Sequence, residues 1–193
     1  MTTTDTRTRI LDASAELFRR QGMTGTGLKQ IATEASAPFG SIYHFFPGGK
    51  SELVASVLRQ AGAMYRDLVM AFFADTDDLL GAIDTAFAEA AEVLAATDYA
   101  DACPIETIAL EVASTDDALR QVTAEVFADW IETGAEHLRR QGLSPEAARR
   151  LIIGLITGLE GAFVLSRSMR IPEPLLAAGR MVRAAAAAEL SLA

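Results

Sequence analysis

Apolar residues along this chain recur at steps of three and four positions, the spacing that places them on one face of a helix. Near the N-terminus, two parallel series that start at Ile10 and Leu11 predict a helix over residues 4–21, which Gly22 ends. No segment shows the sustained alternation of apolar and polar residues that is typical of a strand. The pattern therefore predicts an all-α fold of about nine helices.

Capping residues and helix breakers divide the rest of the first fifty positions. Thr26 is expected to cap a short second helix, residues 36–37 to form a tight turn, and Pro38 to begin a brief third helix. A Pro-Gly-Gly break follows at residues 47–49. Two short helices around a tight turn have the spacing of a helix-turn-helix, so residues 1–49 predict a DNA-binding domain.

The remaining residues, 50–193, are interpreted as a C-terminal helical bundle for ligand binding and dimerisation. Ser144 followed by Pro145 is a strong helix start, because serine caps the helix and proline suits its first turn. The predicted helices of this bundle cover residues 50–74, 77–96, 104–113, 117–141, 145–170 and 173–190.

The charge of the chain is unevenly distributed. A net charge of −9 argues by itself against nucleic acid, since phosphate binding requires a basic surface. However, residues 1–50 contain six basic and four acidic side chains, a net +2, whereas the rest of the chain carries −11. A basic N-terminal segment followed by an acidic remainder allows the N-terminal segment alone to approach DNA.

Composition limits the other classes of protein. The first residues are polar and no run of about 18 apolar residues lacks a charge, which predicts a soluble, cytoplasmic protein with no membrane partner. Cys103 together with His44 and His137 provides too few ligands for an ordinary zinc site, so neither a metal nor a cofactor is predicted. Because no nucleophile with its base can be identified, an all-α enzyme using Glu106, Glu160 or Cys103 remains only an alternative.

Residues 24–53, TGTGLKQIATEASAPFGSIYHFFPGGKSEL, resemble the DNA-binding domain of the TetR family of transcriptional regulators. The resemblance implies that Tyr43, His44 and Lys50 hold phosphates, while Thr26 and Ser41 lie near the backbone or the bases. A phenol, an imidazole and an ammonium group all donate hydrogen bonds to phosphate oxygens. The candidate DNA-binding residues are Thr26, Lys29, Pro38, Phe39, Gly40, Ser41, Tyr43, His44 and Lys50.

Alternatives remain for single residues of this block. Tyr43 and His44 are open to a structural role, and Lys29 to being a solvated surface residue. Phe39 stands where the family commonly has lysine or arginine; its ring cannot donate a hydrogen bond but is able to touch a thymine methyl. The amides of Gly48 and Gly49, at a helix start, are expected to favour an anion.

The FPGGK segment and the Ala102–Ile105 segment resemble the LmrA/YxaF branch of the same family, which implies a flavonoid-like aromatic effector. Apolar residues at helical spacing are able to line a pocket for such a guest, or to form only the core. Glu160, within an apolar helix, needs a partner, which is either a ligand or a neighbouring helix. The candidate ligand-binding residues are Met64, Leu68, Phe72, Phe87, Cys103, Glu106, Ile108, Phe127, Trp130, Leu159 and Phe163.

The family resemblance also implies a homodimer in which the last two helices form a four-helix interface. Two recognition helices would then read half-sites about 34 Å apart on a palindromic operator. The expected function is that of a repressor that a small aromatic or apolar effector releases from double-stranded DNA. The effector is expected to displace the helix that starts near Lys50, which is taken as the only rigid connection to the DNA-binding domain. Alternatives are a regulator without small-molecule input and an activator.

Overall fold

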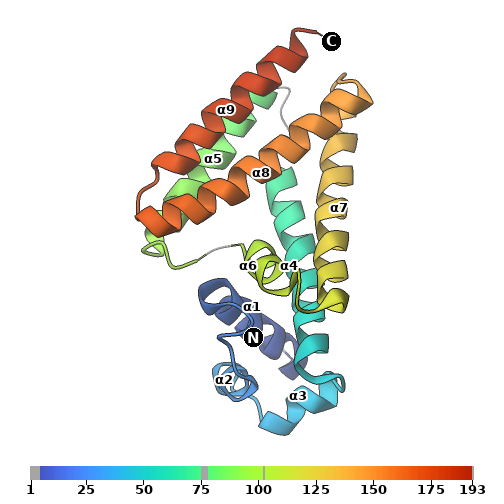
Figure 1. The fold of residues 1–193 in the computed structure, drawn as a ribbon, viewed down its shortest axis with the longest axis vertical. Coiled ribbons are helices and arrows are strands. Elements are labelled where there is room, and N and C mark those ends of the chain that lie inside the picture. The colour runs from blue at the N-terminus through green and yellow to red at the C-terminus, as the bar shows by residue number, and fades with distance from the viewer. Residues whose placement is uncertain (1–4, 75–77, 102, 193) are drawn as a thin grey trace. The chain divides into compact units, whose positions relative to one another are not determined.

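The computed structural model describes residues 5–74, 78–101 and 103–192, and all regular structure within these ranges is helical (Figure 1). This confirms the all-α fold and the expected number of helices for the described residues. The helices are α1 (Thr6–Gln21), α2 (Leu28–Glu34), α3 (Phe39–Phe45), α4 (Gly49–Ala74), α5 (Leu79–Ala96), α6 (Pro104–Val112), α7 (Asp117–Arg140), α8 (Pro145–Met169) and α9 (Glu173–Leu190).

Most helix ends agree with the expected capping residues. Ser144 Oγ accepts the Ala147 N–H at 3.2 Å and begins α8, and Gly22 ends α1 with a positive φ of 73°. Two predicted helix starts, at residues 4 and 77, lie outside the described residues, as does Ala102 of the family-like segment. Pro38 is the N-cap of α3 and not its first helical residue.

The expectation that Thr26 caps α2 is wrong. Gly27 is the N-cap, with no side-chain capping bond, and the Thr26 hydroxyl donates to the Gly22 carbonyl at 2.7 Å. Thr26 is only 1% exposed, so its hydroxyl satisfies a buried carbonyl at the end of α1. The need of that carbonyl for a donor outweighs the local preference of threonine for a helix start.

Contacts divide the chain into two compact units. The first contains Met1–Met64 and Cys103–Val126, and the second contains Tyr65–Ala102 and Phe127–Ala193. Thus α6, assigned from the sequence to the C-terminal bundle, packs with α1 in the first unit. The division of function between residues 1–49 and 50–193 stays a prediction.

The core of the first unit fixes the helix-turn-helix. Ile42 is the buried residue of α3 and is fully inaccessible, and Phe46 at the end of that helix is 1% exposed. Arg9 Nε donates to the Ala35 carbonyl at 3.0 Å, which anchors the turn after α2. Ser36 follows with a φ of 47°, a left-handed conformation within the turn that joins α2 to α3.

In the second unit, α9 packs against both α5 and α8. A Cβ added at Gly179 of α9 would lie 2.8 Å from Phe87 Cβ, so the glycine permits this close approach. Phe87 is 2% exposed and belongs to the core of the unit. Phe72, Leu159 and Phe163 are partly buried and pack against the same core.

Candidate nucleic-acid interface

Helix α3 has one buried and one exposed face. Ile42 lies in the core, while Phe39 is 43% exposed and Tyr43 is 50% exposed. Pro38, Gly40 and His44 are also exposed. The structure therefore presents these predicted DNA-binding residues together on one short helix and its cap.

The two exposed aromatic rings of α3 contact each other. Phe39 and Tyr43 are four positions apart, and their ring centroids lie 5.8 Å apart in an edge-to-face arrangement at 76°. A Cβ added at Gly49, which has a φ of 70°, would lie 3.7 Å from Tyr43 Cε1, so the turn into α4 runs beside the tyrosine ring. His44 packs edge-on against Phe45, with 4.8 Å between ring centroids.

Basic side chains on other elements of the first unit complement the exposed face of α3. Lys29 on α2 is exposed and Lys50 in the first turn of α4 is half-buried, and neither ammonium group pairs with another group of the described residues. Arg7 lies over the Phe46 ring at 5.4 Å. By contrast, Arg20 is paired with Glu16 at 3.0 Å. Lys29 and Lys50 are thus available to phosphate oxygens.

The expectation of an anion site at Gly48 and Gly49 does not hold. The Gly48 N–H donates to Glu52 Oε2 at 2.7 Å and the Gly49 N–H donates to the Phe46 carbonyl at 2.8 Å, so the expected anion site has no free amide. A carboxylate one turn into α4 already satisfies the positive helix end. Thr26 is buried and Ser41 is half-buried, so neither belongs to the most exposed part of the face.

A residue that sequence reasoning missed ties α6 to the helix-turn-helix. Glu111 Oε2 accepts the Thr24 backbone N–H at 2.7 Å and the Thr24 hydroxyl at 2.8 Å. The partners are 87 positions apart, so no local pattern announces the contact. Through this carboxylate, α6 holds the loop that precedes α2.

The predicted ligand-binding residues are divided between the two units. Phe87 belongs to the core of the second unit, and Phe72, Leu159 and Phe163 pack against that core. Glu160 is half-buried on the same helix as Leu159 and Phe163. Phe127 and Trp130 contact edge-on at 5.5 Å between ring centroids. Among the remaining predicted ligand-binding residues, Cys103 and Ile108 are buried in the first unit and Glu106 is half-buried. Met64 and Leu68 are 56% and 54% exposed.

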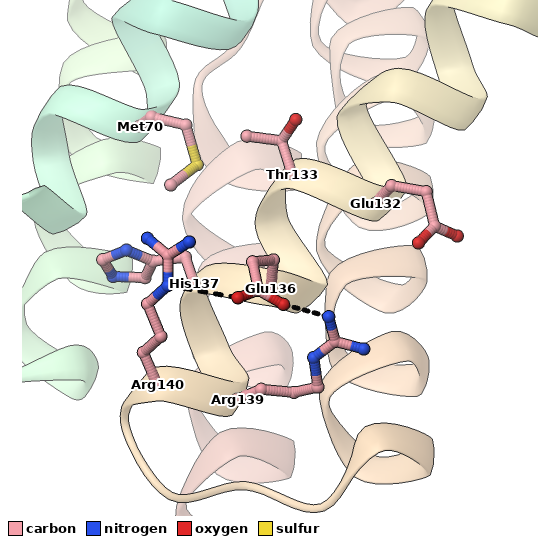
Figure 2. Close-up of a pocket in the computed structure, with 7 residues that line it drawn as sticks. All are labelled: Met70, Glu132, Thr133, Glu136, His137, Arg139 and Arg140. Carbon is pink, nitrogen blue, oxygen red and sulfur yellow. Dashed lines mark hydrogen bonds and ion pairs between the residues drawn. The ribbon is translucent and has the colours of Figure 1, made fainter.

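A shallow pocket of about 480 Å³ in the second unit is lined by Met70, Glu132, Thr133, Glu136, His137, Arg139 and Arg140 (Figure 2). Figure 2 shows Arg139 and Arg140 on either side of the Glu136 carboxylate, which Arg140 reaches at 3.2 Å. The hydrogen bond from Arg139 lowers the pKa of Glu136 and raises the pKa of Arg139. This lining is mostly charged and shares no residue with the predicted ligand set, so it does not suit an apolar guest.

The C-terminal helices expose small and apolar side chains. Helix α8 is long and apolar enough to cross a membrane by length and composition, a test that core helices of soluble proteins also pass, and 28% of its apolar window is buried. Positions Gly154 and Gly161 of α8 have no atom within 4 Å of an added Cβ. The exposed large apolar residues of the two helices are Ile153, Val164, Leu165, Met169, Leu176, Met181 and Leu190.

Two family models match the chain. The model for bacterial regulatory proteins of the tetR family matches residues 10–57, which include α2, α3 and the start of α4. The model for the C-terminal domain of LmrA/YxaF-like transcriptional regulators matches residues 80–181.

Known proteins are similar over most of the chain. The HTH-type transcriptional regulator YxaF of Bacillus subtilis is 33% identical over 172 residues, covering 89% of this chain and 90% of YxaF. LmrA of the same organism is 30% identical over 172 residues, covering 89% and 92%. The regulatory protein TetR from Rhodobacter sphaeroides has a TM-score of 0.82 at 21% identity, covering 93% of this chain and 98% of that one, which shows a shared fold. The matched families and relatives are transcriptional regulators and not enzymes.

Proposed function

Because the chain belongs to the TetR family of transcriptional regulators, we propose that it represses transcription from a palindromic operator and is released by a small aromatic or apolar effector. Regulators of this family bind DNA, dimerise and bind small-molecule effectors, and a cytoplasmic location suits such a protein. The observation that carries the proposal is the exposed face of α3, which presents Tyr43 and His44. Lys50, in the first turn of α4, adds an ammonium group that pairs with no group of the described residues.

In this proposal α3 enters the major groove and the surrounding donors fix its register. The Tyr43 hydroxyl, the His44 imidazole and the Lys50 ammonium group contact phosphates, and Lys29 adds a contact from α2. These phosphate contacts position the helix-turn-helix on the duplex but do not distinguish one base sequence from another. Thr26 supports the interface from inside, by holding the end of α1.

We assign dimerisation to the exposed faces of α8 and α9. Exposed apolar side chains such as Val164, Leu165 and Met181 are costly in water and are covered when a second copy packs on them. Gly154 and Gly161 leave open space at which a helix of the partner is able to approach closely. A two-fold dimer matches a palindromic operator, since each protomer reads one half-site.

In this proposal the effector signal reaches the helix-turn-helix through α4, and α6 supports it within the first unit. Helix α4 continues from the first unit into the second. Helix α6 packs on α1 and, through Glu111, holds the Thr24 loop. A coupling of about 1–3 kcal/mol between effector and operator would weaken DNA binding roughly 5–150-fold.

The proposal is tested by binding of the purified protein to its own upstream intergenic DNA, and to a randomised DNA pool, at 50 and 200 mM salt. Specific binding should weaken with salt. Lys50→Ala should lower the salt slope by about 2, one lost phosphate contact for each protomer of a dimer. Arg120→Ala removes an exposed charge that is paired with Asp117 on α7 and serves as the matched control. Absence of specific binding to any DNA would overturn the proposal.

Release is then measured with aromatic compounds added to the bound complex. Dissociation by a compound that also binds the protein alone supports effector control. If compounds bind without changing the DNA affinity, the alternative of a regulator without small-molecule input is favoured. A transcription assay on the same promoter separates repression from activation.

A further inference from the structure

The first turn of α3 presents almost no hydrogen-bonding side chain. In a recognition helix, the N-terminal residues are the ones that contact base edges in the major groove. Here the exposed positions at that end are Pro38, Phe39 and Gly40, and the hydroxyl-bearing Ser41 is half-buried. The donors, Tyr43 and His44, come a turn later. Base reading at the start of α3 therefore depends on an apolar surface.

The ring of Phe39 is held ready for contact. It packs edge-on against Tyr43 at 5.8 Å between centroids, and Tyr43 is itself bordered by the turn at Gly49. Nevertheless, 43% of Phe39 is exposed. Beyond its own helix backbone and chain neighbours, no described atom lies within 4 Å of a Cβ added at Gly40, so the position next to Phe39 leaves room for a base pair. A ring held in this way loses little side-chain entropy on binding.

The major groove offers one apolar group, the C5-methyl of thymine. Against a G·C pair, the Phe39 ring would cover polar edge atoms without supplying a hydrogen bond, which is unfavourable. Resting on the proposed function, in which α3 enters the major groove, we propose that Phe39 reads a thymine methyl in each operator half-site. This contact sets the base preference at that position, while Tyr43, His44 and Lys50 hold the backbone.

Replacement of thymine by deoxyuridine tests the proposal, because it removes only the methyl and keeps every hydrogen-bonding group. Single thymines of the mapped operator are replaced in turn and the Kd is measured by fluorescence anisotropy. At one position in each half-site, we expect binding to weaken about fourfold for one half-site and about fifteenfold for both, as burial of one methyl predicts.

The variants assign the effect to the side chain. Phe39→Ala should bind the thymine and uracil operators equally, whereas Phe39→Leu, which keeps an apolar side chain, should still prefer thymine. Specific binding that no uracil replacement weakens overturns the role of Phe39 but leaves the repressor proposal standing. A uracil penalty that persists in Phe39→Ala also overturns it, since another residue then reads the methyl. Failure to bind any operator specifically overturns both proposals.

Discussion

Replacing Glu111 by alanine removes the carboxylate that joins α6 to the loop before α2. Its Oε2 accepts two hydrogen bonds from Thr24, at 2.7 Å from the backbone N–H and 2.8 Å from the hydroxyl. Its Oε1 fills the space beside Gly22, where an added Cβ would collide with it. The substitution thus leaves the Thr24 loop without its partner on α6.

The size of the effect follows from these contacts. A hydrogen bond to a charged group contributes about 1.5–3 kcal/mol when it is well shielded. Thr24 is exposed and Glu111 is half-buried, so water competes for both groups. We therefore expect the free energy of unfolding to fall by about 1–2 kcal/mol in Glu111→Ala, with a lower Tm by about 2–8 °C.

The assay is urea unfolding at one fixed protein concentration, arranged as a double-mutant cycle with Thr24→Ala. That partner change removes the hydroxyl bond but keeps the backbone bond, so we expect a coupling of about 0.5–1 kcal/mol. Glu89→Ala, an exposed acid on α5, is the matched control and should change little. Additivity within about 0.3 kcal/mol would refute the coupling through the hydroxyl. An unfolding free energy that Glu111→Ala leaves unchanged would refute the argument that α6 acts through this carboxylate.

Three further predictions test the interior and the exposed apolar side chains. Thr26→Val should lower the free energy of unfolding by about 1 kcal/mol, because the Gly22 carbonyl loses its donor, and should leave the salt slope of DNA binding unaltered; a reduced slope would instead make Thr26 a phosphate contact. Gly179→Ala should cost about 1–3 kcal/mol in urea unfolding, since its Cβ would lie 2.8 Å from Phe87 Cβ, and an unchanged midpoint would contradict this packing. Leu165→Glu, at a position that is 54% exposed, should convert a dimer to a monomer in analytical ultracentrifugation with unchanged circular dichroism; a monomeric parent protein would contradict the dimer.

Local features of the sequence predicted the helices well, because the signals for a helix and its ends lie within a few residues of one another. Ser144 caps α8 and Gly22 ends α1 as expected. The exposed face of α3 also followed from a short motif whose residues are neighbours on one helix. Where two local preferences competed, as at Thr26, the buried carbonyl of Gly22 decided the outcome.

Patterns among neighbouring residues were enough to predict the all-α fold, the position of the helix-turn-helix and the residues that this motif presents. Those patterns did not predict that α6 packs with α1 or that Glu111 holds Thr24. They also did not predict that Met64 is exposed and Phe87 buried, although both residues are apolar. The physical reason is distance along the chain. A helix forms from contacts three or four positions apart, whereas the pairing of Glu111 with Thr24 spans 87 positions and depends on how whole helices pack.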